Sequence, residues 1–424
     1  ASAGTSNFRA GVNAGNSIAS GGNYNTVVGD EAGTAITTGD LNTFLGYNAG
    51  ATTATASDNT GVGYNAGAAI TTGVQNILIG GLAGDSITDA DHNTVVGYAA
   101  LSDNVLGSKS VAIGWGVLAD QNPSSAANMY NTAVGYNAGR LVTTGTANTL
   151  IGGLAGDAIT TQSNITAVGN NALTANTSGQ RGTAVGSAAL AGNTTGDYNT
   201  AVGFTALQAN TTADNNTAVG YAALLANTTG IQNTAVGTFA GDAMTTAGGN
   251  TALGYNAMSA CTTGGGNTAV GNVAMANGVV TGLYNTALGG GSLLVLTSGA
   301  NNTGIGKDAL AANTTGNNNV ALGYTALGAN TTGVENIAIG KGALDANTTA
   351  NSNVGIGNNA LGVNTTGASN VAIGSATLDA NTTASNNTAV GSSALTANTI
   401  GAFNTALGRN AGTANTTASR NTFV

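Results

Sequence analysis

The feature that most constrains this chain is a repeat of 17 residues, each copy opening with NTAVG or a close variant. With that Asn counted as position 1, the starts follow one another at intervals of 17 residues with three exceptions. The exceptions are 18 residues from Asn7 to Asn25, 21 from Ser110 to Asn131 and 18 from Asn267 to Asn285. Such a constant register indicates that equivalent positions stack on one another, because one inserted residue would turn core side chains toward solvent.

The residue types within each repeat favour a strand over a helix. Gly stands at position 5 throughout, and Gly, Asn and Thr all oppose helix. Positions 2 to 4 carry Thr, Val or Ile, then mostly Ala, then Val, Ile or Leu, which is the alternation of a short strand with one buried face. We expect position 4, as in Val134, to fill the core, and the TTG of positions 13 to 15 to form a second strand closed by a turn. The predicted fold class is all-β, a parallel β-solenoid (β-roll or β-helix) of about 24 coils.

The array divides the chain simply. Residues 1–24 form an N-terminal segment with a degenerate first coil, and residues 25–424 form one continuous β-solenoid. The four extra residues of the longest interval predict a loop insertion near 119–130. This segment holds Pro123, the only proline, which cannot donate to a strand ladder.

Two positions carry the predicted framework. Position 1 is Asn in 22 of the 25 starts, which predicts a ladder of stacked side-chain amides. Gly at position 5 predicts a sharp corner with positive φ or a close approach of two backbones. The ladder and corner residues that represent these positions are Asn25, Asn42, Asn131, Asn199, Gly29, Gly46, Gly135 and Gly203.

Positions 9 and 12 vary together. Leu at position 9 accompanies Asn at position 12, as in Leu207 and Asn210, whereas Gly at position 9 usually accompanies a large apolar residue, as in Gly241 and Met244. This pattern predicts one core space that is filled from either position at constant volume. The exceptions are Gly50 with Thr53 and Gly412 with Asn415.

Composition excludes several classes of function. The net charge is −9 with only eight Lys and Arg, which argues against nucleic acid as a partner. No run of about 18 apolar residues exists, so we expect no membrane span. His92 and Cys261 are single, and we expect a solvated loop residue and a small buried hydrophobe. Without a catalytic triad, a paired-carboxylate site or a metal-ligand cluster, we expect no catalytic residue, metal, cofactor or enzymatic activity.

Aromatic residues recur at position 6, just past the corner Gly. Such a stripe predicts packing against another chain or shielding of the ladder, with ligand binding as the alternative. Its members are Tyr47, Tyr64, Tyr98, Trp115, Tyr136, Phe204, Tyr221, Tyr255 and Tyr324.

Two further features suggest surface functions. NTT or NTS at positions 12 to 14, as at Asn193, Asn227 and Asn381, matches the N-glycosylation signal, although a repeat of Asn and Thr produces such matches for structural reasons. Rows of Thr on a flat face suggest ice binding, a hypothesis that the Asn, Gly and Ala substitutions in those rows weaken.

The phrases also resemble known families. SVAIG at Ser110 and NVAIG at Asn370 resemble the head repeats of bacterial trimeric autotransporter adhesins, which are trimeric parallel β-rolls. NTAVGYxALxANTTG looks like the repeat arrays of phage tail-fibre and bacterial surface proteins. The resemblance covers nearly the whole chain and implies a fibrous, oligomeric protein.

The function that we expect is structural. The chain would be a non-enzymatic subunit of an extracellular or cell-surface fibre, self-associating as a trimer or head-to-tail filament and mediating adhesion. Alternatives are a phage tail-fibre shaft or receptor-binding protein on the virion, and an ice- or glycan-binding solenoid. The partners would be other copies of the chain and a cell-surface glycan or receptor. The expected head-to-tail contact is Asn421, Thr422, Phe423 and Val424.

Overall fold

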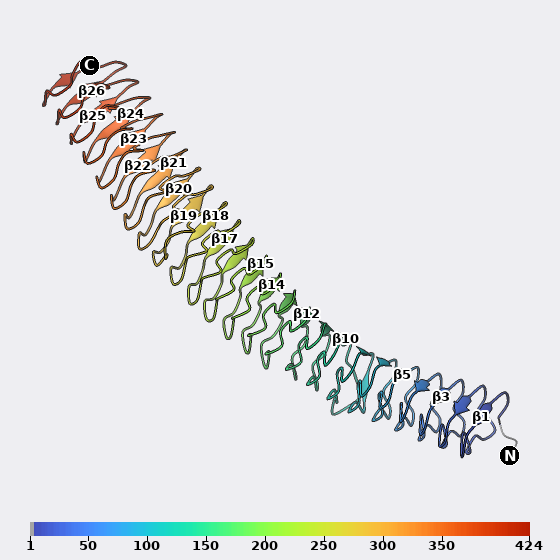
Figure 1. Ribbon diagram of the computed structural model, residues 1–424. Coiled ribbons are helices and arrows are strands. Elements are labelled where there is room, and N and C mark those ends of the chain that lie inside the picture. Colours follow the sequence, from blue (N-terminus) through green and yellow to red (C-terminus); the bar gives the residue numbers. More distant parts are fainter. Residues whose placement is uncertain (1–3) are drawn as a thin grey trace. The chain divides into compact units, whose positions relative to one another are not determined.

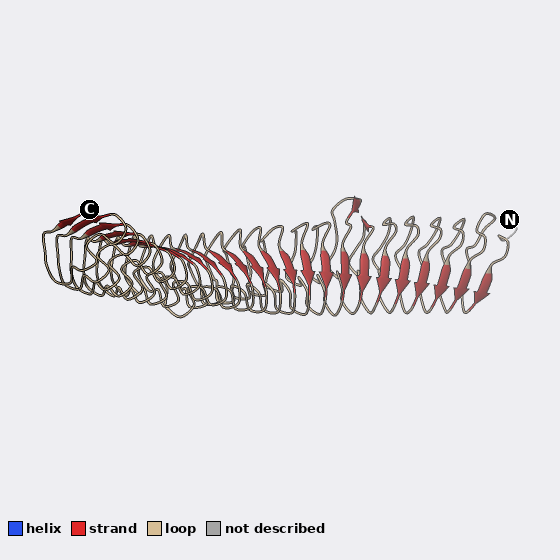
Figure 2. Ribbon diagram, turned by 90° about the horizontal axis from the view of Figure 1, so that it is seen from above, coloured by secondary structure: helices blue, strands red, loops and turns tan. Residues whose placement is uncertain are grey.

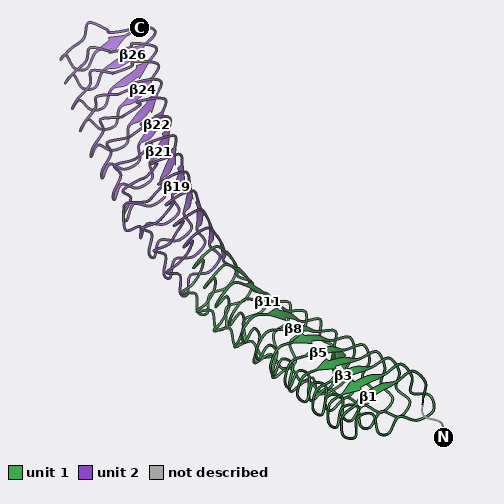
Figure 3. Cartoon of the chain, turned by 45° about the vertical axis from the view of Figure 1, so that its right-hand side comes forward, with its two compact units in different colours: residues 1–214 green, residues 215–424 purple. Residues whose placement is uncertain are grey.

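The computed structural model describes residues 4–424, so residues 1–3 of the expected N-terminal segment 1–24 lie outside the described part. Strands and turns account for this range, and no helix occurs in it. Two compact units divide the chain at residues 214 and 215 (Figure 3). Each unit is a β-solenoid in its own right (Figure 1).

The strands are short, and almost all have three residues. The first unit contains β1 (Phe8–Ala10), β2 (Thr26–Val28), β3 (Thr43–Leu45), β4 (Thr60–Val62), β5 (Ile77–Ile79), β6 (Thr94–Val96), β7 (Gly107–Ser108), β8 (Val111–Ile113), β9 (Ala127–Asn128), β10 (Thr132–Val134), β11 (Thr149–Ile151), β12 (Thr166–Val168), β13 (Thr183–Val185) and β14 (Thr200–Val202). The second contains β15 (Thr217–Val219), β16 (Thr234–Val236), β17 (Thr251–Leu253), β18 (Thr268–Val270), β19 (Thr286–Leu288), β20 (Thr303–Ile305), β21 (Val320–Leu322), β22 (Ile337–Ile339), β23 (Val354–Ile356), β24 (Val371–Ile373), β25 (Thr388–Val390), β26 (Thr405–Leu407) and β27 (Thr422–Phe423).

Consecutive coils pair in parallel with identical positions side by side. In the first unit Thr26 lies beside Thr43, and in the second Val371 lies beside Thr388. The red arrows of Figure 2 follow one another in this order. The predicted fold class is therefore confirmed: the chain is an all-β parallel solenoid of about 24 coils.

Each coil contributes one strand to this ladder, not two. The predicted second strand at positions 13 to 15 is wrong for nearly every coil of residues 4–424, because positions 13 and 14 form a bend; the exception is Gly107 at position 15, which begins β7. Backbone hydrogen bonds still join neighbouring coils there, as from Thr37 N to Ala54 O at 2.9 Å. A second, two-stranded sheet forms only beside the insertion, where β7 pairs with β9 in the described chain.

The strand faces are inverted relative to the prediction. Ala133 at position 3 is buried, whereas Val134 at position 4 is partly exposed, and this pattern holds in almost every strand. The reason lies in position 1, since the ladder Asn points inward. Side chains alternate along a strand, so positions 1 and 3 share the inner face while positions 2 and 4 face outward. Val134 therefore does not fill the core.

The shared core space of positions 9 and 12 is confirmed. Leu207 and Met244 are both buried, and a Cβ placed on Gly241 would lie 3.0 Å from Met244 Cε. The two exceptions follow the same rule, because a phenylalanine fills the space instead. A Cβ on Gly50 would lie 2.5 Å from Phe44 Cε1, and one on Gly412 would lie 2.7 Å from Phe423 Cδ2.

Candidate interaction surface

The interior of each coil is held by the position-1 ladder. Asn42 donates its backbone N–H and its Nδ2 to Asn25 Oδ1, each at 3.0 Å, and a second Nδ2 bond reaches Ala56 O at 2.9 Å. Asn131 and Asn199 make the same bond across the coil, to the position-15 carbonyls of Gly145 and Ala213. Each side chain therefore joins neighbouring coils and also braces its own.

A second amide ladder, which the sequence analysis missed, runs along position 12. Asn330 Nδ2 donates to Asn313 Oδ1 at 2.9 Å and to Gly333 O at 3.1 Å. Asn319 at position 1 donates to the same Gly333 carbonyl at 2.8 Å, so both ladders converge on one acceptor. The sequence held a signal for this ladder, because Asn at position 12 accompanies Leu at position 9 in these coils.

This second ladder contains the three predicted glycosylation acceptors named above. Asn193, Asn227 and Asn381 are the acceptor residues of three N-x-[ST] matches, and all three are buried. Asn193 Nδ2 and Asn381 Nδ2 donate within the ladder at 3.0 and 2.8 Å. A glycan cannot be attached to these side chains in the folded chain.

In the coil before the insertion, Gln121 makes the ladder hydrogen bonds that Asn makes at position 1 elsewhere. Ser110 stands where the ladder expects Asn and is too short to reach across. Gln121, one methylene longer than Asn, accepts from Asn131 Nδ2 at 2.9 Å and donates to Ser110 Oγ at 3.2 Å. Longer and shorter side chains thus keep the polar core satisfied.

The corner glycines explain how the coils approach so closely. Gly29, Gly46, Gly135 and Gly203 have φ between +128° and +139°, a region that other residues avoid. A Cβ on Gly135 would lie 2.5 Å from Gly152 O in the next coil. Only glycine fits this position.

The outer face of the strand ladder is an uncharged apolar band. From β2 onward position 2 is Thr, Val or Ile and position 4 is Val, Ile or Leu, with no charged residue at either. Leu45, Leu253 and Leu407 at position 4 are 47%, 45% and 56% exposed. We call the side chains of positions 2 and 4 the outer band.

The aromatic stripe borders this band. Tyr136 is 56% exposed, and its ring stacks on Trp115 at 5.2 Å between centroids with 14° between planes. Tyr47 stacks on Tyr64 at 5.8 Å and 9°. In these pairs each ring therefore covers one face of its neighbour. The remaining members that are also about half exposed are Tyr98, Phe204, Tyr221, Tyr255 and Tyr324.

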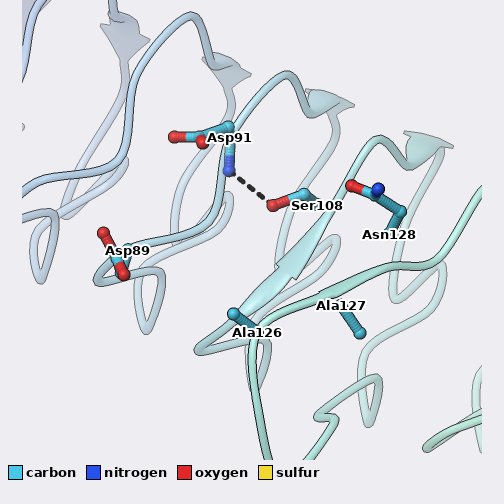
Figure 4. A pocket seen from close by; sticks show the side chains of 6 residues that line it. All are labelled: Asp89, Asp91, Ser108, Ala126, Ala127 and Asn128. Atoms are coloured by element: carbon cyan, nitrogen blue, oxygen red, sulfur yellow. Dashed lines mark hydrogen bonds between the residues drawn. The ribbon is translucent and has the colours of Figure 1, made fainter.

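One open pocket of about 280 Å³ lies beside the insertion (Figure 4). Hydrogen bonds engage three of its side chains: Asp91 Oδ1 accepts from Val74 N at 2.8 Å, Ser108 Oγ accepts from Asp91 N at 2.9 Å, and Asp89 accepts from Thr72. Within residues 4–424 no group of three or more His, Cys, Asp or Glu could hold a metal ion.

The only histidine and the only cysteine of the sequence are His92 and Cys261. His92 is exposed in a bend with φ +59°. Cys261 is buried, and burial raises the pKa of its thiol to about 11, which keeps it protonated and unreactive near neutral pH.

Residues 421–424 begin one more coil. Asn421 N donates to Asn404 Oδ1 at 3.0 Å, and Thr422 and Phe423 pair with β26. Val424 is 97% exposed. A head-to-tail contact at this segment stays a prediction.

Comparison with known proteins gives no family for the chain. No protein-family model matches it, and no curated protein is similar enough to count as a match. Over the described residues, no helical segment has the length and hydropathy to cross a bilayer.

Proposed function

We propose that the chain is a structural, non-enzymatic fibre subunit that associates with further copies of itself, at a cell surface or outside the cell. The outer band is the observation that carries this proposal. Exposed apolar surface that continues from coil to coil typically marks a protein interface. The adhesin-like and tail-fibre-like phrases support the same assignment, with a virion fibre as the alternative location.

The charge distribution favours association along this band. The chain carries a net charge of −9, which disfavours the approach of identical copies. No charged residue stands at positions 2 or 4 from β2 onward, so two bands can meet without burying like charges. The remaining faces of the assembled fibre would then mediate adhesion.

Sedimentation velocity over a concentration series, with electron microscopy of the same samples, tests this proposal. We expect oligomers or filaments whose share rises with concentration. A chain that remains monomeric up to its solubility limit would contradict the proposal.

Ice binding is a second candidate, which the Thr row favours. Every strand of β10–β14 in the first unit and of β15–β20 in the second begins with Thr on the outer face. Thermal hysteresis in the purified chain, lost when Thr234 and Thr251 are changed to Lys, would support this candidate. Absence of hysteresis in a folded sample would remove it.

A further inference from the structure

Four consecutive strands of the second unit differ from the rest of the outer band. β21–β24 begin with Val320, Ile337, Val354 and Val371 where most strands begin with Thr, and each ends in Leu or Ile. Val320 and Ile337 are 36% and 38% exposed. Eight aliphatic side chains therefore form one continuous outer patch, which we call the aliphatic patch.

We propose that the aliphatic patch binds the same patch of a second copy, face to face, with both chains running in the same direction. This inference rests on the proposed function and adds to it the place and the orientation of the contact. It makes the second copy, and no other partner, the occupant of the patch.

The spacing of the patch is the first reason for a second copy. Its side chains stand in rows that repeat once per coil, at the strand spacing of about 4.8 Å. A partner whose rows match along the whole patch must present rows at the same spacing. The chain's own outer band does so, and a two-fold axis parallel to the direction in which coils stack sets each row of one copy against the equivalent row of the other.

The available area is the second reason. Positions 2 to 4 span about 10 Å, so with coils about 4.8 Å apart each coil offers about 48 Å². The twelve strands β15–β26 then offer about 570 Å² per copy, which is the size of a transient, concentration-dependent interface. The aliphatic patch would supply the apolar centre of that interface, where binding energy concentrates.

Charges at the rim select the parallel orientation. Glu335 and Lys341 are both exposed and flank β22 at its two ends. A two-fold axis parallel to the direction in which coils stack places Lys341 of one copy opposite Glu335 of the other. The antiparallel arrangement of the same patch pairs β22 with β23, which places Glu335 opposite Ser352 and Lys341 opposite Asn358 and so forms no pair of opposite charges.

The first experiment replaces Val320, Ile337, Val354 and Val371 together with Thr. Thr occupies this position in most coils, so the solenoid is expected to keep its circular dichroism and melting temperature. We expect the dissociation constant for self-association to rise at least about tenfold. The control is Ile77→Thr with Val111→Thr on the outer band of the first unit, for which we expect less than about a twofold change.

Charge exchange tests the orientation. Lys341→Glu and Glu335→Lys should each weaken association about two- to fivefold at low salt, and the double variant should restore it. A double variant no better than either single one would overturn the parallel arrangement.

The outcomes separate this inference from the proposed function. If the wild-type chain associates and the four-Thr variant associates equally well, the patch assignment fails and the proposed function stands. If the wild-type chain is monomeric, both fail. Adsorption of a monomeric chain to ice or to phosphatidylcholine vesicles through the same four residues would assign the patch another occupant and also overturn the inference.

Discussion

At the scale of single residues, backbone conformation decides which side chains the coil accepts. Position 5 has φ between +127° and +140° in every coil. Position 9 is also left-handed, with Gly33 at +54° and Leu207 at +51°. Leucine in this region is strained by about 1 kcal/mol or more, and burial of its side chain offsets the strain. The choice between Gly and Leu at position 9 therefore has a backbone cause that the sequence pattern alone did not show.

Two corner glycines separate the contribution of φ from that of contact. Gly391 has φ +134°, and a Cβ there would lie 2.5 Å from Gly408 C. Gly408 has φ +127°, and nothing lies within 4 Å of such a Cβ. We expect Gly408→Ala to lower the free energy of unfolding by about 1–3 kcal/mol through strain, and Gly391→Ala by about 1–3 kcal/mol more through overpacking. Urea denaturation measures both, and equal losses would show that contact contributes nothing.

At the scale of the coil, part of the architecture followed from sequence and part did not. The period, the Asn ladder at position 1 and the exchange between positions 9 and 12 were readable, because each is a residue type at a fixed spacing. The burial of Ala133 instead of Val134 was not predicted, since hydrophobicity favours the larger side chain as core. The inward Asn131 two residues earlier determines the face, so alternation from the ladder would have given the correct assignment.

The exchange in the core predicts a double-mutant cycle at Gly241 and Met244. Gly241→Leu alone should cost about 1–3 kcal/mol, because its Cβ would lie 3.0 Å from Met244 Cε and 3.1 Å from Leu224 Cδ2. Met244→Asn alone should cost about 2–5 kcal/mol, because it empties the core space. The double variant should lie within about 1 kcal/mol of wild type, since its Asn could donate to Ala247 O as position-12 Asn residues do elsewhere.

Chemical denaturation of the four proteins measures this cycle. The same pair at Gly156 and Ile159 serves as control, because Leu150 also occupies that space, with Leu150 Cδ2 at 2.8 Å from a Cβ on Gly156. The double variant at Gly156 and Ile159 should therefore remain destabilised. Additive losses at Gly241 and Met244 would contradict the shared space.

At the scale of the whole molecule, sequence predicted the fold class and the aromatic stripe but not the outer band. The stripe is visible because tyrosine is rare elsewhere in the chain. The outer band became visible only after the strand faces were known, since Val, Ile and Leu at position 4 were assigned to the core. The aliphatic patch on β21–β24 follows from the same correction, because Val320 and Ile337 are surface residues only when position 2 faces outward.

The charge balance of the molecule predicts stability in acid. Residues 4–424 hold one ion pair, Lys307 with Asp308 at 3.4 Å, whereas burial raises the pKa of Asp85, Asp120, Asp242, Asp345 and Asp379 above the ordinary 3.8. Between 3.8 and these raised values the folded chain binds more protons than the unfolded chain, so the free energy of unfolding falls as pH rises. We expect a higher melting temperature at pH 4 than at pH 7.

Asp85 and Asp242 each hold a buried carboxylate oxygen without a hydrogen-bond partner, so Asp85→Asn with Asp242→Asn should stabilise the chain at pH 7 and leave it nearly unchanged at pH 4. Calorimetry at the two pH values checks this, and a wild-type chain that melts earlier at pH 4 would show that desolvation of these carboxylates does not set the pH dependence.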